Sequence, residues 1–155
     1  ISQPSNLALV TQTTLSVDDT KQIIEILKKR FPKIKSPNAD DICYATQTRQ
    51  DAVKQLALET DFIIVVGSEN SSNSNRLKEL AELMGTESCL VDHVSQLSED
   101  SLKNISKLGI TSGASAPEEL VKEIISYCKG FWFSIVEEIQ GLKENISIKL
   151  PKELR

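Results

Sequence analysis

Phe62-Ile-Ile-Val-Val66 and the polar run that follows it, Gly67-Ser-Glu-Asn-Ser-Ser-Asn-Ser-Asn75, carry the strongest structural signal in the sequence. Five consecutive apolar residues, four of them β-branched, predict a strand that is buried on both faces. The serines and asparagines then indicate a loop, and an amphipathic helix is expected from there to about Gly85. A strand, a polar loop and a helix in this order are typical of a parallel sheet covered by helices.

The same order of apolar run, polar loop and amphipathic helix occurs on both sides of this stretch. We expect strands at 7–11, 62–66, 88–92 and 108–111, and helices at 17–31, 46–59, 76–85 and 116–129. Capping-box spacings are present at Ser16 with Asp19 and at Ser115 with Glu118. Residues 145–150 alternate like a half-buried strand. The predicted fold class is therefore α/β, built from three-layer units with parallel sheets.

Length and composition exclude several classes of protein. The 155 residues correspond to about one ordinary domain, and 39% hydrophobic with 26% charged residues is typical of a globular chain. A net charge of −4 and only 5% aromatic residues argue against a nucleic-acid partner. No apolar run approaches the roughly 18 residues of a membrane span, so no membrane partner is expected.

Cysteine and histidine usage bears on the compartment and on metal binding. Three widely spaced cysteines, Cys43, Cys89 and Cys128, do not form a disulfide pattern and favour a reducing compartment. A single histidine, His93, excludes a self-contained histidine zinc site. The sequence begins at Ile1 without an initiator methionine or a leader, which we interpret as a piece cut from a longer chain.

Two polar loops are expected at the carboxyl edge of the sheet, where ligands of parallel α/β proteins bind. Helix N-termini with serine hydroxyls and asparagine amides suit phosphate, so the runs 68–75 and 112–117 are candidate anion-binding loops. The alternative is that Ser71 and Ser115 only cap helices. Cys43 precedes a helix and is a candidate nucleophile or metal ligand, or a plain buried thiol. Thr13 and Thr14 are candidates for hydrogen bonds to a ligand.

Five segments together resemble one known family. They are Gln12-Thr-Thr-Leu-Ser-Val-Asp-Asp19, Asp41-Ile-Cys-Tyr-Ala-Thr-Gln-Thr-Arg-Gln50, Val65-Val-Gly-Ser-Glu-Asn-Ser-Ser-Asn-Ser-Asn-Arg76, Gly109-Ile-Thr-Ser-Gly-Ala-Ser-Ala-Pro117 and Leu150-Pro-Lys-Glu-Leu154. Their order and spacing resemble the LytB/IspH family of 4-hydroxy-3-methylbut-2-enyl diphosphate reductases, over nearly the whole chain. The resemblance implies reductive dehydroxylation of that diphosphate to isopentenyl and dimethylallyl diphosphate, in the non-mevalonate isoprenoid pathway.

The resemblance also implies an architecture and a cofactor. Family members have three similar α/β domains around a central cavity that holds an iron–sulfur cluster. Residues 1–40 would then end the middle domain, 41–127 would form the third domain, and 128–155 the C-terminal extension. Cys43 matches one of three cysteine ligands of a [4Fe–4S] cluster, and the other ligands lie upstream of this chain. The fragment alone is therefore expected to be inactive.

The family's substrate contacts carry over residue by residue. Its diphosphate-binding positions match Ser71, Ser72, Asn73 and Ser115, and Thr13 matches the threonine near the substrate hydroxyl, with Thr14 beside it. The resemblance implies a cytoplasmic protein that takes electrons from a donor such as ferredoxin or flavodoxin. The alternatives are a metal-free phosphate-binding module, such as a sugar-phosphate isomerase-like or regulatory domain, and an interaction fragment without a site.

Overall fold

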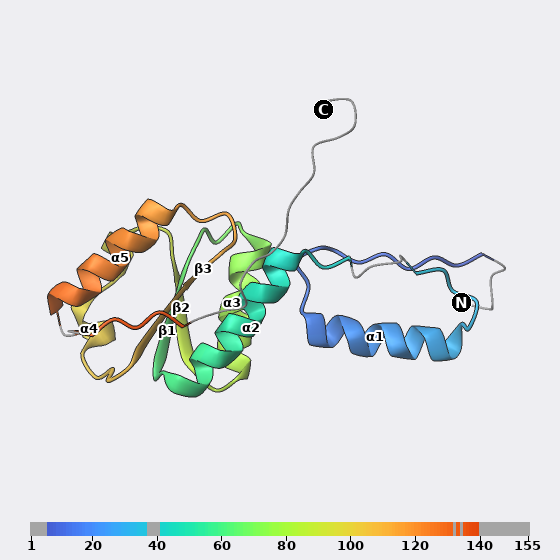
Figure 1. Cartoon of the computed structure of the whole chain (residues 1–155), viewed down its shortest axis with the longest axis horizontal. Helices are drawn as coiled ribbons and strands as arrows, with labels where there is room; N and C mark the ends of the chain where they lie inside the picture. The colour runs from blue at the N-terminus through green and yellow to red at the C-terminus, as the bar shows by residue number, and fades with distance from the viewer. Residues whose placement is uncertain (1–5, 37–40, 132, 134, 140–155) are drawn as a thin grey trace, which may run out of the picture.

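The computed structural model describes residues 6–36, 41–131, 133 and 135–139. They form two parts that Figure 1 shows side by side: an α/β unit that begins at residue 41, and a smaller unit of residues 6–36 that contains helix α1 (Val17–Arg30). The smaller unit lies past the N-terminal end of helix α2 (Tyr44–Glu59), and the start of α2 there adjoins the start of α1. This junction positions several of the candidate residues.

The α/β unit has a parallel sheet of three strands. They are β1 (Phe62–Val66), β2 (Glu87–Val91) and β3 (Leu108–Ser112), in the spatial order β2-β1-β3. Val66, at the end of β1, lies opposite Val91 on one side and Ser112 on the other, so all three strands end at the same edge. The α/β class and the three expected strands are confirmed, each to within one residue.

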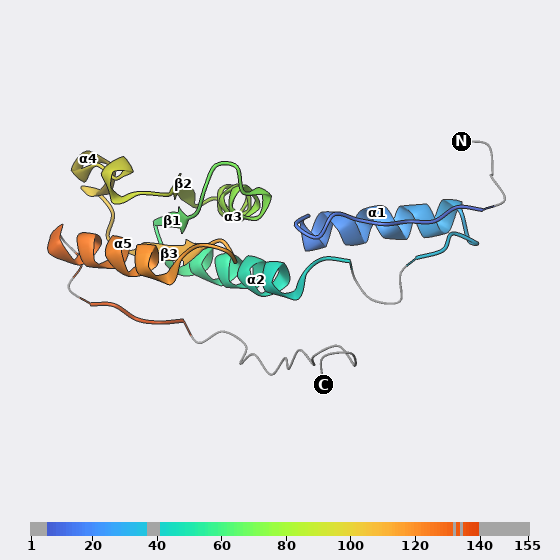
Figure 2. The same cartoon turned by 90° about the horizontal axis from the view of Figure 1, so that it is seen from above.

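Helices cover both faces of this sheet. Figure 2 looks along the strands, with α2 and α3 (Ser72–Leu83) on one side and α4 (Glu99–Leu102) and α5 (Glu118–Phe131) on the other. Alternate residues of β1 enter different cores: Ile63 and Val65 pack with the first helix pair, whereas Ile64 packs with the second. All five residues of β1 are buried, which explains why its apolar run does not alternate.

One prediction for residues 6–36, the strand at 7–11, is wrong. The expected strand at 7–11 is not formed, and the segment makes a single parallel bridge between Ala8 and Lys35. The described chain places no further strand beside it, and a strand requires neighbours to complete its ladder. Helix α1 forms as expected and is capped by Ser16, whose Oγ accepts from the Asp19 amide at 3.2 Å.

Helix α3 begins at Ser72, so half of the expected loop 68–75 is the first turn of a helix. The expected strand at 145–150 lies outside the described residues. In the part of the chain that is described, no helix is long and apolar enough to cross a membrane.

Candidate active site

The two candidate anion loops leave the sheet next to each other. The amide of Gly67, after β1, donates to the Val91 carbonyl at 2.8 Å, and the amide of Gly113, after β3, donates to the Val66 carbonyl at 2.9 Å. The loops therefore continue the parallel ladder by one residue before they diverge toward helices α3 and α5. The carboxyl edge of the sheet brings together residues that lie about 40 positions apart in the sequence, as expected.

Ser74 fills the space between these two loops. It is 1% exposed, and a Cβ added at either Gly67 or Gly113 would overlap its Oγ. Both glycines are therefore required by a close approach to Ser74, and the first turn of α3 is seated directly on the sheet edge. The Ser74 hydroxyl also donates to Ser71 Oγ at 3.0 Å. Sequence reasoning did not single out Ser74, because a serine within a serine-rich run carries no individual signal.

Asn73 has a buried amide with no partner among the described residues. Its side chain is 8% exposed, and neither Oδ1 nor Nδ2 makes a hydrogen bond there. Nδ2 lies beside Gly113, 3.7 Å from the position of a Cβ built on that residue. An unpaired buried amide destabilises a protein by about 1–3 kcal/mol, so its presence requires an explanation. A ligand that accepts a hydrogen bond from Nδ2 would satisfy the donor group of this amide.

Ser71 combines two roles that the sequence left as alternatives. It is the N-cap of α3, and its Oγ accepts from the Ser74 amide at 3.3 Å as well as from the Ser74 hydroxyl. A hydroxyl has two acceptor sites and one proton, so Ser71 keeps its own proton for donation to a ligand. Capping the helix and binding an anion are therefore compatible at this position.

Ser115 is exposed, and its hydroxyl has no hydrogen-bond partner within the described ranges. The expected capping box with Glu118 is not formed, because Glu118 is itself the first residue of α5 and pairs with Lys122 at 2.6 Å. The preceding turn is closed instead by the Ala116 amide, which donates to the Gly113 carbonyl at 3.1 Å. The Ser115 hydroxyl is thus free to bind a ligand.

Ser72 and Thr14 line one cavity of about 270 Å³ between the start of α3 and the loop before α1. Among the described residues that line it, Arg76 is the only basic one, and its guanidinium pairs with Glu79 at 2.8 Å. This cavity brings residues of the smaller unit against the first turn of α3. Thr14 and Ser72, which the sequence placed on different loops, therefore share one lining.

Thr13 and Cys43 are joined directly. The Cys43 amide donates to the Thr13 carbonyl at 3.0 Å, and both residues are exposed. Two residues away, the carboxylate of Asp41 accepts from the Thr11 amide at 2.9 Å. The candidate hydroxyl-binding loop and the candidate metal ligand are therefore neighbours, although 30 positions separate them in the sequence.

Cys43 fits the role of a single cluster ligand. It occupies the N-cap position of α2, makes no side-chain capping bond and is exposed, so its thiol is available to an external group. Iron–sulfur clusters are held by cysteine sulfur, so an accessible thiol is what such a ligand requires. Within the described residues no group of three cysteines, histidines or carboxylates is placed to hold a metal ion.

The other two cysteines are less accessible than Cys43: Cys89 is half-buried and Cys128 is buried. Burial raises the pKa of the Cys89 thiol to about 11, against the opposing charge of Lys78, and burial also raises the pKa of Cys128. Cys128 lies in the core between the sheet and α5. His93 lies at the surface, where its Nδ1 accepts from the Ser95 amide at 3.1 Å.

The fold and the residues at its edge define a parallel α/β protein whose candidate site lies at the carboxyl ends of the strands. Cys43, which is exposed, adjoins the smaller unit through the hydrogen bond from its amide to the Thr13 carbonyl. Comparison with known proteins gives the family. The chain belongs to the LytB protein family, whose model matches residues 1–129.

Relatives and solved structures agree with this membership. The chain is 54% identical to the 4-hydroxy-3-methylbut-2-enyl diphosphate reductase of Methylococcus capsulatus, over all of this chain and 50% of that protein. It is 56% identical to the enzyme of the same name from Saccharophagus degradans, again over 50% of its length. The Plasmodium falciparum E-1-hydroxy-2-methyl-but-2-enyl-4-diphosphate reductase superposes with a TM-score of 0.89 at 35% identity, covering 99% of this chain and 49% of that one. The chain thus spans about half the length of the relatives it matches.

Proposed function

We propose that this chain is the C-terminal half of a 4-hydroxy-3-methylbut-2-enyl diphosphate reductase, an iron–sulfur oxidoreductase of the non-mevalonate isoprenoid pathway. The full-length protein, meaning this chain with the N-terminal half that the proposal requires, converts its substrate to isopentenyl and dimethylallyl diphosphate. Membership of the LytB family supports this function over a metal-free phosphate-binding module. Residues 1–40 then complete a middle domain, 41–127 form the third domain, and 128–155 form a C-terminal extension.

The unpartnered amide of Asn73 carries the proposal. It is buried at the N-terminus of α3, where backbone amides and the helix dipole attract anions. Asn73 Nδ2 would donate to a diphosphate oxygen together with the hydroxyls of Ser71, Ser72 and Ser115. No basic side chain is needed, since several neutral donors share the negative charge.

Thr13 and Thr14 lie on the loop before α1, which faces the first turn of α3 across one cavity, and would act on the hydroxyl end of the substrate. A threonine hydroxyl both donates and accepts, so Thr13 can hold the substrate hydroxyl and pass it a proton as the carbon–oxygen bond breaks. Its backbone carbonyl is already fixed by the Cys43 amide. Thr14 would orient the substrate from the wall of the neighbouring cavity.

Cys43 would provide one ligand of a [4Fe–4S] cluster, with the remaining ligands in the N-terminal half. When bound, the cluster supplies the electrons for the reduction and a Lewis-acidic iron that activates the substrate hydroxyl as a leaving group. Electrons reach the protein from a small donor such as ferredoxin or flavodoxin. The reaction consumes two electrons and two protons, and releases the hydroxyl as water.

Anaerobic purification of the full-length protein tests this function. A brown protein that contains iron and sulfide, and that forms isopentenyl diphosphate from the substrate with reduced ferredoxin, is the expected result. A colourless, iron-free protein that binds inorganic diphosphate would instead support the metal-free module. In the active enzyme, Thr13→Val should lower kcat while the affinity for inorganic diphosphate is retained.

A further inference from the structure

The loop that carries Thr13 and Thr14 is attached to helix α2 and the residues just before it by a series of polar contacts. Asp41 and Cys43 bind the backbone at Thr11 and Thr13, and Lys54 pairs with Asp18 at 2.7 Å. Between them, Gln50 contacts the two residues on either side of the α1 N-cap. The smaller unit adds no side chain to either hydrophobic cluster of the α/β unit. Apart from the buried Ile42, which lines a cavity with Leu9 and Ile24, the contacts that position the loop are therefore polar.

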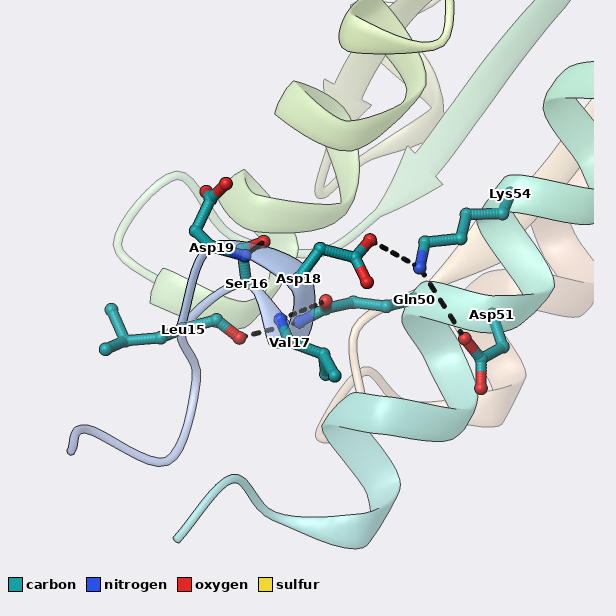
Figure 3. A network of polar contacts seen from close by, with 8 residues as sticks. All are labelled: Leu15, Ser16, Val17, Asp18, Asp19, Gln50, Asp51 and Lys54. Atoms are coloured by element: carbon teal, nitrogen blue, oxygen red, sulfur yellow. Dashed lines mark hydrogen bonds and ion pairs between the residues drawn. The ribbon is translucent and has the colours of Figure 1, made fainter. Parts of the chain in front are cut away.

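Gln50 is the buried member of this series. Its side chain is 2% exposed, although it lies in the middle of a helix. Nε2 donates to the Leu15 carbonyl at 2.8 Å, and Oε1 accepts from the Val17 amide at 3.1 Å, as Figure 3 shows. Both ends of the side-chain amide are thus used by the backbone of a segment 33 to 35 positions away.

Packing alone does not explain a glutamine at this position. An apolar side chain of similar size would fill the same space, but it would leave the Leu15 carbonyl and the Val17 amide without partners. The exposed ion pair between Lys54 and Asp18 is screened by solvent and fixes geometry only weakly. What Gln50 supplies is a defined orientation of the loop relative to α2.

Helix α2 fixes the position of this loop relative to Cys43, the proposed metal ligand. Cys43 stands at the N-cap of α2, and Gln50 follows it by seven positions, or about 10 Å along a rigid helix at 1.5 Å per residue. The same helix therefore carries the thiol at its end and holds the threonine loop from its side. We propose that Gln50 is a positioning residue, which fixes Thr13 and Thr14 at the working distance from the Cys43 thiol. This inference rests on the proposed reductase function.

The test replaces Gln50 in the full-length protein. Gln50→Met keeps the volume and removes both hydrogen bonds, whereas Gln50→Glu keeps an acceptor for the Val17 amide and loses the donor to Leu15. We expect kcat to fall on the order of 10–100-fold in Gln50→Met and less in Gln50→Glu, because misplacing a reacting group by about 1 Å has effects of this size. The affinity for inorganic diphosphate should stay within about twofold, since no described contact joins Gln50 to Asn73 or Ser115.

Amide hydrogen exchange gives a readout that does not depend on turnover. In Gln50→Met the amides of Val17 and Cys43 should exchange faster, while that of Val65 in β1 stays protected. Gln55→Met is the matched control: the same substitution at an exposed position of the same helix, which should leave kcat and exchange unchanged.

The outcomes separate the two proposals. Wild-type kcat in Gln50→Met would overturn the positioning role, and so would a parallel fall of kcat, diphosphate affinity and melting temperature, which marks a general loss of folding. A wild-type full-length protein without iron or reductase activity would refute the proposed function instead. In that case, faster exchange at Val17 and Cys43 would still show that Gln50 holds the loop, and unchanged exchange would refute it.

Discussion

The backbone amide of Cys43 donates its hydrogen bond to the carbonyl oxygen of Thr13 over 3.0 Å. The residue proposed to bind the cluster and the residue proposed to act on the substrate hydroxyl are thus linked through their backbones. A movement of either loop would displace the other. Precise placement of this kind matters more for the rate of a reaction than for the binding of a remote diphosphate.

Replacing Asn73 by leucine should raise the stability of the protein and lower its affinity for diphosphate. The change removes the buried, unpaired amide, so the ligand-free full-length protein should become more stable, by about 1–3 kcal/mol. Affinity for inorganic diphosphate should fall about 10–150-fold, which corresponds to the loss of ~1.5–3 kcal/mol. Thermal unfolding with and without diphosphate measures both effects. A lower melting temperature with unchanged affinity would show that the amide serves the fold alone.

Ser71→Ala and Ser115→Ala should both weaken diphosphate binding, but only Ser71→Ala should lower the stability of the protein. Ser71 caps α3, so its loss should lower the unfolding free energy by about 0.5–2 kcal/mol and weaken diphosphate binding. Ser115 has no hydrogen-bond partner in the described chain, so its loss should weaken binding at an unchanged melting temperature. Calorimetric titration beside thermal unfolding distinguishes the two. Equal destabilisation by both substitutions would contradict this difference.

The two glycines around Ser74 should respond differently to its truncation. Alone, Gly67→Ala and Gly113→Ala should each destabilise the protein by about 1–3 kcal/mol through overlap with Ser74 Oγ. Adding Ser74→Ala should rescue Gly113→Ala, whose new methyl would lie 3.6 Å from Ser74 Cβ. It should not rescue Gly67→Ala, whose methyl would remain 2.8 Å from that atom. Denaturant unfolding of the double variants measures the coupling, and rescue of both would contradict the geometry.

Cys43→Ser in the full-length protein should lose iron without weakening the N-terminus of helix α2. Serine is a preferred N-cap residue, and Cys43 makes no capping bond that the change would remove, so α2 should be as stable as before or more so. Cys89→Ser is the control and should retain iron, because the Cys89 thiol faces the core. Iron content and visible absorption after anaerobic purification give the result. Equal iron loss in both variants would remove the assignment of Cys43.

Cys89 should react slowly with alkylating reagents. Its pKa of about 11, against an ordinary 9.0, lowers the thiolate fraction below pH 9 by about 100-fold. Iodoacetamide labelling followed by peptide mass mapping should therefore modify Cys89 rapidly only after denaturation. Rapid labelling of Cys89 in the folded protein at pH 8 would contradict the burial that raises its pKa.

The raised pKa of Cys89 also makes the stability of the protein depend on pH in the alkaline range. The unfolded chain loses the Cys89 proton from pH 9 upward, while the folded protein keeps it to about pH 11. The folded state therefore binds more protons in this interval, and the contribution of Cys89 to stability, fully present below pH 9, is lost as the pH rises toward 11. Denaturant titrations at pH 8 and pH 10.5 should show a smaller decline in Cys89→Ala than in the wild type.

The sequence predicts the α/β unit well because its signals are local. An apolar run buried on both faces predicts β1, and polar runs after β1 and β3 indicate the ligand edge. The start of α3 is placed too late, because serine and asparagine favour loops while Ser71 in fact begins the helix as its cap. The strand expected at 7–11 fails because strand formation depends on neighbours that an apolar run does not encode.

Residues that act through distant partners escape sequence reasoning. Gln50 lies within an ordinary helical pattern, and its partners Leu15 and Val17 stand 35 and 33 positions away. Ser74 gains its role only where two glycines from different strands meet it. The family resemblance indicates candidate ligand-binding positions, whereas the contacts that hold those positions in place are visible only in three dimensions.

Helix α1 buries a single residue, Thr20, and its neighbours Ile23 and Ile26 are 56% and 65% exposed. Within the described residues, the attachment of this unit to the α/β unit is therefore mainly polar, with the buried Ile42 beside Leu9 and Ile24 as its apolar part. Detaching it would expose little apolar surface, so the step would have a small m-value and a small heat-capacity change. A denaturant titration would therefore detect the cooperative unfolding of the three-stranded sheet. It would not detect the earlier detachment of the loop that carries Thr13 and Thr14.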